Sequence, residues 1–419
     1  MSKYSYKCFD CSSQFTSEKI ETERIYLCPN CGKAEKNQPL RGVLLVEYDY
    51  ENLKRKLNRE KFLKISCGKF WLYPDLWPIN FLEKTIPKSS LDKITLTNEP
   101  LLEYEIGGKK FFVFDDTRNP TLSYKDRATT LVICKALELG ISEIAAASTG
   151  NAGSSLAGIC TRLGLKSHIF VPEKIPSAKR IQIQSFGANL YLVQGDYDQA
   201  FDLCLEISKK KNWYNRNTAY NPLTIEGKKS AAFDIFISMK GKIPDKIFVP
   251  VGDGVIISGL FKGFSDLLRL GWIDKLPQLI AVQAEGSSAV VRYIDAGKFE
   301  YKSASTIADS IHAGAPRNLF MAANSVMVSN GTAVSVTDEE ILSAQKSIAQ
   351  SFGILAEPSS AASFAGYKKL FQDGKISEKE DVLLMITGNG LKDSASLSTW
   401  NDEPKSKSND EWKKFLLNE

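Results

Sequence analysis

The amino-acid sequence predicts an α/β protein in which a small zinc-ribbon-like module precedes two lobes, each an open, twisted, parallel-rich sheet flanked by helices. Three observations support this prediction. From about residue 111 onward, short apolar runs alternate with amphipathic segments, the pattern of a parallel sheet covered by helices. Two Cys-x2-Cys pairs stand near the N-terminus. The chain has 419 residues, enough for two or three domains with sizeable cores.

The N-terminal pairs consist of Cys8 with Cys11 and Cys28 with Cys31, and 16 residues separate the two pairs. Four thiolates at this spacing surround one zinc ion in a tetrahedron. We therefore expect residues 1–37 to form a zinc-ribbon-like module around a structural Zn²⁺. A ribbon without metal and a nucleic-acid-binding finger are the alternatives.

The two lobes follow from successive strand and helix patterns. In the first lobe we expect strands at 143–148, 167–172 and 190–195, with helices at 152–163 and 177–186 that each end next to a glycine. In the second we expect strands at 246–251, 279–284 and 381–387 and a helix at 259–270. These elements divide the chain into a large catalytic domain at 38–130 and 215–400, a small domain at 131–214 and a polar C-terminal tail at 401–419.

Composition argues against several classes of protein. Lys and Arg number 54 against 49 Asp and Glu, a surplus of 5 that is too small for binding along a nucleic acid. There is no apolar run of 18 residues and no apolar segment typical of a signal peptide, so we expect a cytoplasmic protein with no membrane or nucleic-acid partner. With only His168 and His312, histidine-based metal clusters and triads are disfavoured.

Four loops stand at the expected carboxyl ends of strands, where open α/β sheets bind ligands. They are 119–127, 148–155, 249–259 and 386–393. In the first, Lys125 falls in the first turn of a helix, whose positive end favours the neutral amine that a Schiff-base lysine needs. The second and third offer backbone amides to an anion. Taken singly, each loop is also explained by surface exposure, helix capping or turn chemistry.

Together the four loops resemble the threonine synthase family, within the pyridoxal-phosphate enzymes of tryptophan-synthase-β type, also called fold type II. Residues 119–127 are similar to the family's NPTGSFKDR, and the other three loops follow in the family's order. The resemblance implies that Lys125 forms a Schiff base with pyridoxal 5′-phosphate and moves protons, that Asn151 contacts the ring's 3′-oxygen, and that Thr387 meets the pyridine nitrogen. The cofactor's phosphate would lie against Gly252, Asp253, Gly254, Val255 and Ile256.

The resemblance also implies an amino-acid substrate and a homodimer. The carboxylate of the amino-acid substrate would bind at Ser148, Thr149 and Gly150. The chain departs from the family at Thr224, where an arginine that binds the substrate's phosphate is usual, at Leu122, where glycine is usual, and at Asp253, in GDGVI where GNAGN is common. Further candidates for substrate contacts are Arg127, Lys228 and Arg317.

We therefore expect a pyridoxal-phosphate-dependent carbon–oxygen lyase of amino-acid biosynthesis. A threonine synthase-like enzyme would eliminate phosphate from the γ-carbon of O-phosphohomoserine and hydrate the β-carbon to give threonine. One alternative is a paralogue that performs β-elimination or β-replacement on another activated amino acid, of the serine or threonine dehydratase type or the O-phospho- or O-acyl-serine type. A second alternative is a binding protein on the same fold whose catalytic site has decayed.

Overall fold

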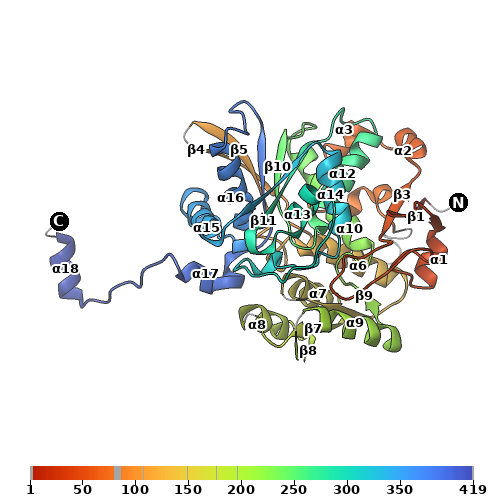
Figure 1. Cartoon of the computed structure of the whole chain (residues 1–419), viewed down its shortest axis with the longest axis horizontal. Helices are drawn as coiled ribbons and strands as arrows, with labels where there is room; N and C mark the ends of the chain where they lie inside the picture. The colour runs from red at the N-terminus through yellow and green to blue at the C-terminus, as the bar shows by residue number, and fades with distance from the viewer. Residues whose placement is uncertain are drawn as a thin grey trace.

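The computed structural model describes residues 3–79, 86–106, 108–148, 150–175, 177–195 and 197–417. These residues form three sheets, with a small antiparallel sheet at the N-terminal side and two larger sheets in the body of the molecule (Figure 1). In the described part of the chain, no helix is both long and apolar enough to cross a membrane.

The large domain is built on a six-stranded sheet with a continuous parallel core. Its order is β12 (Thr332–Val336), β11 (Gln278–Ala284), β10 (Lys246–Pro250), β13 (Val382–Ile386), β5 (Lys109–Asp115) and β4 (Leu101–Ile106), and only β4 is antiparallel. All of β13 is buried, because helices cover both faces of the sheet.

Two hydrophobic clusters occupy the two faces of this sheet. Along β10, Ile247 and Val249 belong to one cluster and Phe248 to the other, as the two-residue period of a strand requires. Helices α15 (Asp338–Phe352) and α16 (Pro358–Gln372) supply the cluster around Phe248. Helices α11 (Ser230–Ser238), α12 (Val255–Arg269) and α14 (Leu319–Val328) supply the other.

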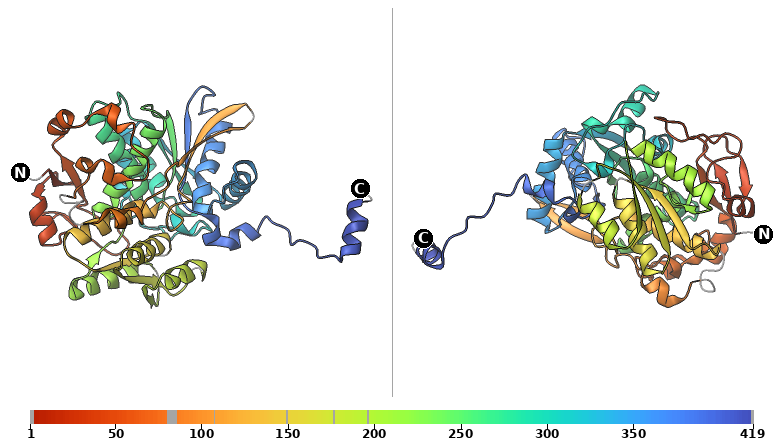
Figure 2. Two further views of the ribbon diagram at one scale, coloured as in Figure 1. Left: turned by 180° about the vertical axis from the view of Figure 1, so that it is seen from behind. Right: turned by 90° about the horizontal axis from the view of Figure 1, so that it is seen from below.

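The small domain has a four-stranded parallel sheet in the order β8 (Asn189–Val193), β7 (Lys166–Pro172), β6 (Glu143–Ala147) and β9 (Tyr214–Asn215). Around it lie α6 (Lys125–Glu138), α7 (Asn151–Arg162), α8 (Ser177–Ser185) and α9 (Tyr197–Lys211) (Figure 2). The strands and helices expected from the sequence agree within two residues, except that α12 begins one turn before the expected 259. Further helices in the described part of the chain are α1 (Ser17–Thr22), α2 (Tyr50–Lys56), α3 (Arg59–Phe62), α5 (Lys88–Asp92), α10 (Leu223–Lys228), α13 (Ala289–Ala296) and α17 (Ser394–Ser398), with a four-residue 3-10 helix at Gly390–Asp393.

The N-terminal sheet extends past the expected boundary at residue 37. Its strands β2 (Gln14–Thr16), β1 (Tyr4–Cys8) and β3 (Leu44–Tyr48) pair in that order, so the sheet itself continues to Tyr48. The C-terminal segment ends in α18 (Asn409–Leu417), which is exposed throughout and lies far from the body of the molecule (Figures 1 and 2).

Candidate active site

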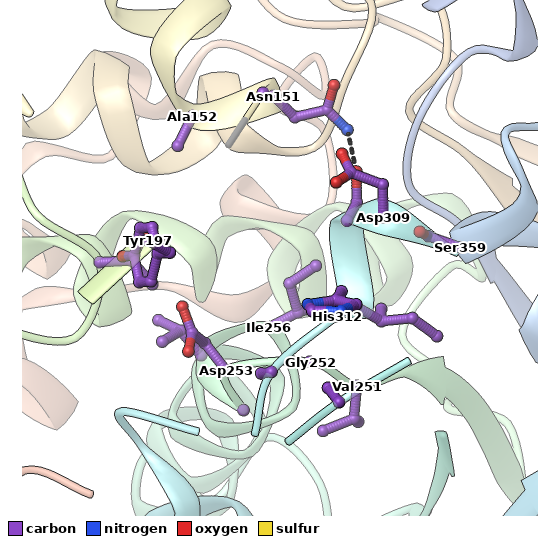
Figure 3. Close-up of a pocket in the computed structure, with 18 of the residues that line it drawn as sticks. Asn151, Ala152, Tyr197, Val251, Gly252, Asp253, Ile256, Asp309, His312 and Ser359 are labelled. Atoms are coloured by element: carbon purple, nitrogen blue, oxygen red, sulfur yellow. Dashed lines mark hydrogen bonds between the residues drawn. The ribbon is translucent and has the colours of Figure 1, made fainter. Parts of the chain in front are cut away.

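A pocket with a cavity of about 220 Å³ lies where β6, β10 and β13 end, and residues of both domains line it. This is the carboxyl edge of the parallel sheets, where the sequence predicted a ligand site. Figure 3 shows Asn151 on one side and Gly252 and Asp253 on another, with the segment of Asp309 and His312 between them. A cavity of this size suits a small molecule.

Lys125 is the first residue of α6, and its side chain lines the pocket. The preceding backbone is held in place, since the Tyr124 amide donates to the Thr387 carbonyl at 2.8 Å. Burial lowers the pKa of Lys125 to about 8, and nearby Arg216 adds to this effect, while Glu357 and Asp253 oppose it. About a tenth of the amine is therefore neutral at pH 7, which is the reactive form for a Schiff base.

Another buried lysine, Lys392, has its pKa lowered to about 8 by burial as well. Its Nζ, however, donates to three neutral acceptors: the Thr121 carbonyl at 2.9 Å, Ser154 Oγ at 3.0 Å and Gln182 Oε1 at 2.6 Å. Lys392 is not among the residues that line the pocket. Geometry rather than the pKa therefore distinguishes Lys125 as the candidate nucleophile.

Two charged neighbours of Lys125 anchor its helix. Asp126 accepts hydrogen bonds from the Thr121 amide and from Ser155 Oγ. Arg127 forms fully buried ion pairs with Asp116 and Asp234, each at 2.6 Å. The structure therefore does not bring Arg127 into the pocket, where we expected it to contact substrate, because its guanidinium is occupied by two carboxylates inside the domain.

Leu122 adopts the left-handed conformation with φ of 66°. The family resemblance places glycine at this position, and the backbone is consistent with a glycine there, since an L side chain in this region costs about 1–2 kcal/mol. The Leu122 carbonyl accepts from the Asn389 amide at 3.1 Å, and its amide donates to the Asn119 carbonyl at 2.8 Å. These two hydrogen bonds hold the loop with Leu122 in the left-handed conformation.

The N-terminus of α7 forms a second wall. Ser148 Oγ accepts from the amides of Gly150 at 3.1 Å and Gly153 at 2.9 Å, which leaves the hydroxyl proton of Ser148 available to a ligand. The Asn151 side-chain nitrogen donates to Glu357 at 2.8 Å and to Ser310 at 3.0 Å, while its oxygen is buried with no partner among the described residues. Thr149 lies outside the described residues.

The N-terminus of α12 forms the third wall, with Gly252, Asp253, Gly254, Val255 and Ile256 lining the pocket. Gly254 has a φ of 86°, and a Cβ at Gly252 would lie 2.7 Å from the Ile311 backbone. The first amides of a helix lack intrahelical acceptors, so this turn presents donors and the positive helix end to an anion. The helix starts at Val255, earlier than expected, because Gly254 ends the preceding loop in a left-handed turn.

Asp253 brings a carboxylate to this wall. One of its oxygens accepts from the Arg317 amide at 3.2 Å, and burial raises the pKa of the acid. The side chain still lines the pocket and faces the region of Tyr197 (Figure 3). Asp253 is therefore a negative group beside the amides that would receive a phosphate.

Thr387 closes the pocket at the end of β13. Its hydroxyl lies 3.2 Å from Ser360 Oγ, and its amide donates to the same oxygen at 3.0 Å. Thr387 lines the pocket together with Ser359, at the start of α16. A hydroxyl thus stands where the resemblance places the contact to a ring nitrogen.

The other two cations that were expected to contact the substrate, Lys228 and Arg317, lie in different places. Lys228 is fully buried and lines the pocket. Arg317 is turned away from it, with its guanidinium paired to Asp198 and donating to the carbonyls of Glu35 and Gln38. Arg317 therefore ties the N-terminal segment to α9, and its side chain is not part of the pocket wall.

Some pocket residues were not anticipated from the sequence. The segment from Tyr301 to Ala315 covers one side, and Tyr197 and Thr218 line another. The irregular segment carries no motif, so no sequence signal marks it. Arg216, which does not itself line the pocket, directly follows β9, and a strand of two residues gives almost no sequence signal that would place it at this edge.

The N-terminal cysteines form a compact group. The sulfur atoms of Cys8, Cys11, Cys28 and Cys31 all lie within 4.8 Å of one another. The sulfurs of Cys8 and Cys31 are 3.4 Å apart, and those of Cys11 and Cys28 are 3.6 Å apart. Four sulfurs at these separations can surround a single tetrahedral ion.

Comparison with known proteins agrees with this arrangement. Residues 94–388 match the family described as pyridoxal-phosphate dependent enzyme, and the chain belongs to that family. Threonine synthase from Methanocaldococcus jannaschii is 36% identical over 407 residues, which cover 95% of each chain. Threonine synthase from Halalkalibacterium halodurans is 37% identical over 320 residues, which cover 75% of this chain and 88% of the relative. Within the family, the chain therefore groups with the threonine synthases.

Solved structures with the same fold include enzymes of other specificities. Diaminopropionate ammonia lyase from Escherichia coli aligns with a TM-score of 0.64 at 16% identity and covers 77% of this chain and 94% of that chain. Maize serine racemase aligns with a TM-score of 0.63 at 17% identity, and the alignment covers 74% of this chain and 94% of the racemase. At such low identity these likenesses establish the fold, and they confirm the predicted two-lobed fold type II architecture.

Proposed function

We propose that this pyridoxal-phosphate-dependent lyase converts O-phosphohomoserine and water to threonine and phosphate. The observation that carries the proposal is the position of Lys125, whose amine reaches a pocket lined by three further anion- or ring-binding elements. The relatives that cover most of the chain are named threonine synthase, which supports the choice of reaction.

The residues of the pocket fit pyridoxal 5′-phosphate. The amides at the start of α12 and Gly252 would hold its phosphate, Thr387 would meet its ring nitrogen, and Asn151 would donate to its 3′-oxygen from the side-chain nitrogen. When bound, the cofactor supplies an electron sink for carbanions at the substrate's α-carbon. A hydroxyl such as that of Thr387 does not enforce a protonated ring nitrogen, which favours elimination and replacement over transamination.

Lys125 would act as the acid–base group. Its amine, with a pKa of about 8, accepts a proton from the α-carbon and returns protons farther along the side chain. The bond from the γ-carbon to oxygen breaks and its electron pair leaves with phosphate. A proton also leaves the β-carbon, and the electron pair of that bond forms the β–γ double bond as phosphate departs. Water then adds its hydroxyl group to the β-carbon. Of the two protons removed and the proton of water, one goes to the γ-carbon, one returns to the α-carbon and one leaves with phosphate, so atoms and charge balance.

The substrate's carboxylate would bind at the start of α7. The Ser148 hydroxyl proton is free to donate, and the helix end presents amides and positive potential. Thr149 and Gly150 complete this part of the proposal. The arrangement orients the α-carbon toward Lys125 across the pocket.

We further propose that the four N-terminal sulfurs bind one structural zinc ion, supported by their mutual distances. The domain boundaries proposed for the body are those expected above, with the N-terminal module extended through Tyr48. A homodimer in the cytoplasm is proposed from the family resemblance, and sedimentation of the purified protein would test the dimer.

One observation favours a second candidate, a paralogue with another activated substrate. Thr224 replaces the arginine that the family resemblance places beside the substrate's phosphate, and its hydroxyl already donates to the Asn221 carbonyl at 2.7 Å and accepts the Ala219 amide at 3.1 Å. Thr224 itself therefore offers no charge to a phosphate.

The test is to supply purified holoenzyme with O-phosphohomoserine and to measure phosphate and threonine together, with Lys125→Ala as the inactive control. Equal formation of both products is expected. Inactivity on this compound with turnover of serine, threonine or an O-acyl amino acid would establish the paralogue instead. A bound cofactor whose spectrum no amino acid changes would indicate a binding protein.

A further inference from the structure

Arg216 is a fully buried cation without an acidic partner. Its Nε donates to Thr129 Oγ1 at 3.2 Å and its Nη1 to Thr218 Oγ1 at 3.1 Å, while Nη2 is buried without any partner. Among the described residues, no carboxylate lies within 4.0 Å of the guanidinium. Burial lowers the pKa of Arg216 to about 10. A buried guanidinium with an unused donor is costly unless an anion joins it.

Lys228 is a second cation of this kind. It is fully buried, and within the described ranges its Nζ has only the Thr224 carbonyl, at 3.3 Å. By contrast, the buried amines of Lys135, Lys229 and Lys262 each pair with carboxylates. Arg216 and Lys228 lack the carboxylate partners that these other buried amines have, which indicates that the two residues bind an anion from outside the chain.

The two cations serve the same part of the pocket. Lys228 and Thr218 line the cavity, and Arg216 lies directly behind Thr218. Because the Thr218 oxygen accepts from Arg216, its own proton is left to donate into the cavity. Burial lowers the pKa of Lys228, and the charge of Arg216 lowers it further, so the positive fields of the two overlap.

We propose that Lys228, Thr218 and Arg216 form the subsite for the phosphate dianion carried by the substrate's side chain. Lys228 and Thr218 contact the anion, and Arg216 positions the Thr218 hydroxyl and offers its free Nη2. That the anion is the phosphate of O-phosphohomoserine rests on the proposed function. The subsite also supplies the charge that Thr224 lacks, from a different point of the same chain segment.

Charge balance favours the substrate's phosphate over the cofactor's. Once Lys125 is joined to the cofactor it no longer carries an ordinary ammonium charge, and the amides of α12 are left for the cofactor's phosphate. Arg216 contributes one positive charge and Lys228, whose pKa a bound anion raises again, contributes a second, and together they match one dianion. Asp253 also acts on Lys228, but no ion pair within 4.0 Å joins these two described residues, and one Asp253 oxygen is bound to the Arg317 amide.

The first experiment measures the affinity of inorganic phosphate for the holoenzyme by calorimetry at constant ionic strength. Arg216→Met and Lys228→Met each weaken phosphate binding by at least roughly tenfold, the loss expected for a charge-assisted contact. Arg162→Met, which removes an exposed charge from the far end of α7, serves as the matched control and leaves phosphate affinity unchanged. Unchanged phosphate affinity in Arg216→Met would overturn the proposal.

Thermal unfolding without phosphate gives a second readout, which separates a binding role from a structural one. If Arg216 is kept for an anion, replacing it with Met removes an uncompensated buried charge, so the Tm of the phosphate-free protein rises. A lower Tm together with unchanged phosphate affinity would make Arg216 a structural residue and contradict the proposal. Thr218→Val, which deletes only a hydroxyl, tests the site without touching either charge and weakens phosphate binding several-fold.

Cofactor affinity identifies which phosphate is bound. Titration of cofactor-free protein with pyridoxal phosphate at about pH 10, where the Lys125 amine is mostly neutral with or without Arg216, gives the same affinity in Arg216→Met as in the original protein if the subsite belongs to the substrate. In turnover, KM for O-phosphohomoserine then rises more than kcat falls. A tenfold loss of cofactor affinity with unchanged phosphate binding to the holoenzyme would assign the cations to the cofactor and refute the substrate subsite. The proposed reaction can fail in its own assay while inorganic phosphate still binds here, so the two failures are distinguishable.

Discussion

The strongest prediction concerns the pH at which Lys125 joins the cofactor. The neutral amine is the reactive form, so the attachment rate should rise tenfold per pH unit below the pKa and level off above it. With a pKa of about 8 rather than the ordinary 10.5, the amine at pH 7 is neutral about 300 times more often. The expected profile has its midpoint near pH 8.

Two substitutions should move this midpoint in opposite directions. Glu357 raises the pKa of Lys125 and Arg216 lowers it. Glu357→Gln should therefore bring the midpoint to roughly pH 7 and Arg216→Met to roughly pH 9, as expected for one charge acting through the protein at an effective dielectric constant near 20. Glu103→Gln, which changes an exposed side chain of β4, should leave the midpoint unchanged.

The assay mixes cofactor-free protein with pyridoxal phosphate in a stopped-flow instrument and follows the absorbance of the lysine-bound cofactor near ~420 nm between about pH 6 and pH 10. A rate that continues to rise through pH 10 would show that burial does not lower the pKa of Lys125. Shifts of the same sign in Glu357→Gln and Arg216→Met would show that the electrostatic argument is wrong.

Three further predictions address stability and the cofactor. Asp234→Ala should lower the free energy of unfolding by about 3–5 kcal/mol, because it leaves the charge of Arg127 buried and only partly compensated. The control Glu103→Ala, which removes an exposed ion pair, should lower it by less than about 1 kcal/mol. Denaturant unfolding of both variants measures the two values. Asp253→Asn should tighten cofactor binding roughly tenfold by removing a buried negative charge beside the helix end that would receive phosphate, and weaker binding in an equilibrium titration would count against the phosphate site at α12. Metal analysis should find one zinc per chain, and its removal by a chelator should lower the Tm; a fully stable metal-free protein would exclude a structural metal.

Much of the architecture could be predicted from local patterns. The parallel sheets follow from buried apolar runs between helices, and the pocket follows from the rule that ligands bind at the carboxyl ends of parallel strands. The loops that carry Lys125, Asn151, Gly252 and Thr387 were located this way, the family resemblance singled out the residues within them, and the structure brings all four to one pocket. Their predicted roles toward the cofactor stay predictions.

Long-range pairing limited the prediction for the charged residues. Arg127 looked available for substrate, but its partners Asp116 and Asp234 lie 11 and 107 residues away, and no local pattern reveals such pairs. Arg317 was expected near the substrate, yet its side chain meets carbonyls of the N-terminal segment, 279 and 282 residues away. Arg216 was missed because the strand before it has only two residues and gives almost no periodic signal.

The most direct test of the account is to locate the covalent attachment of the cofactor. Borohydride treatment of the holoenzyme, followed by peptide mapping with mass spectrometry, should place the label on Lys125 in full. Lys392 has a similarly lowered pKa and Lys228 lies in the same pocket, so both are genuine competitors. Label on either of them, or none at all, would contradict the assignment of Lys125 on which the proposed chemistry depends.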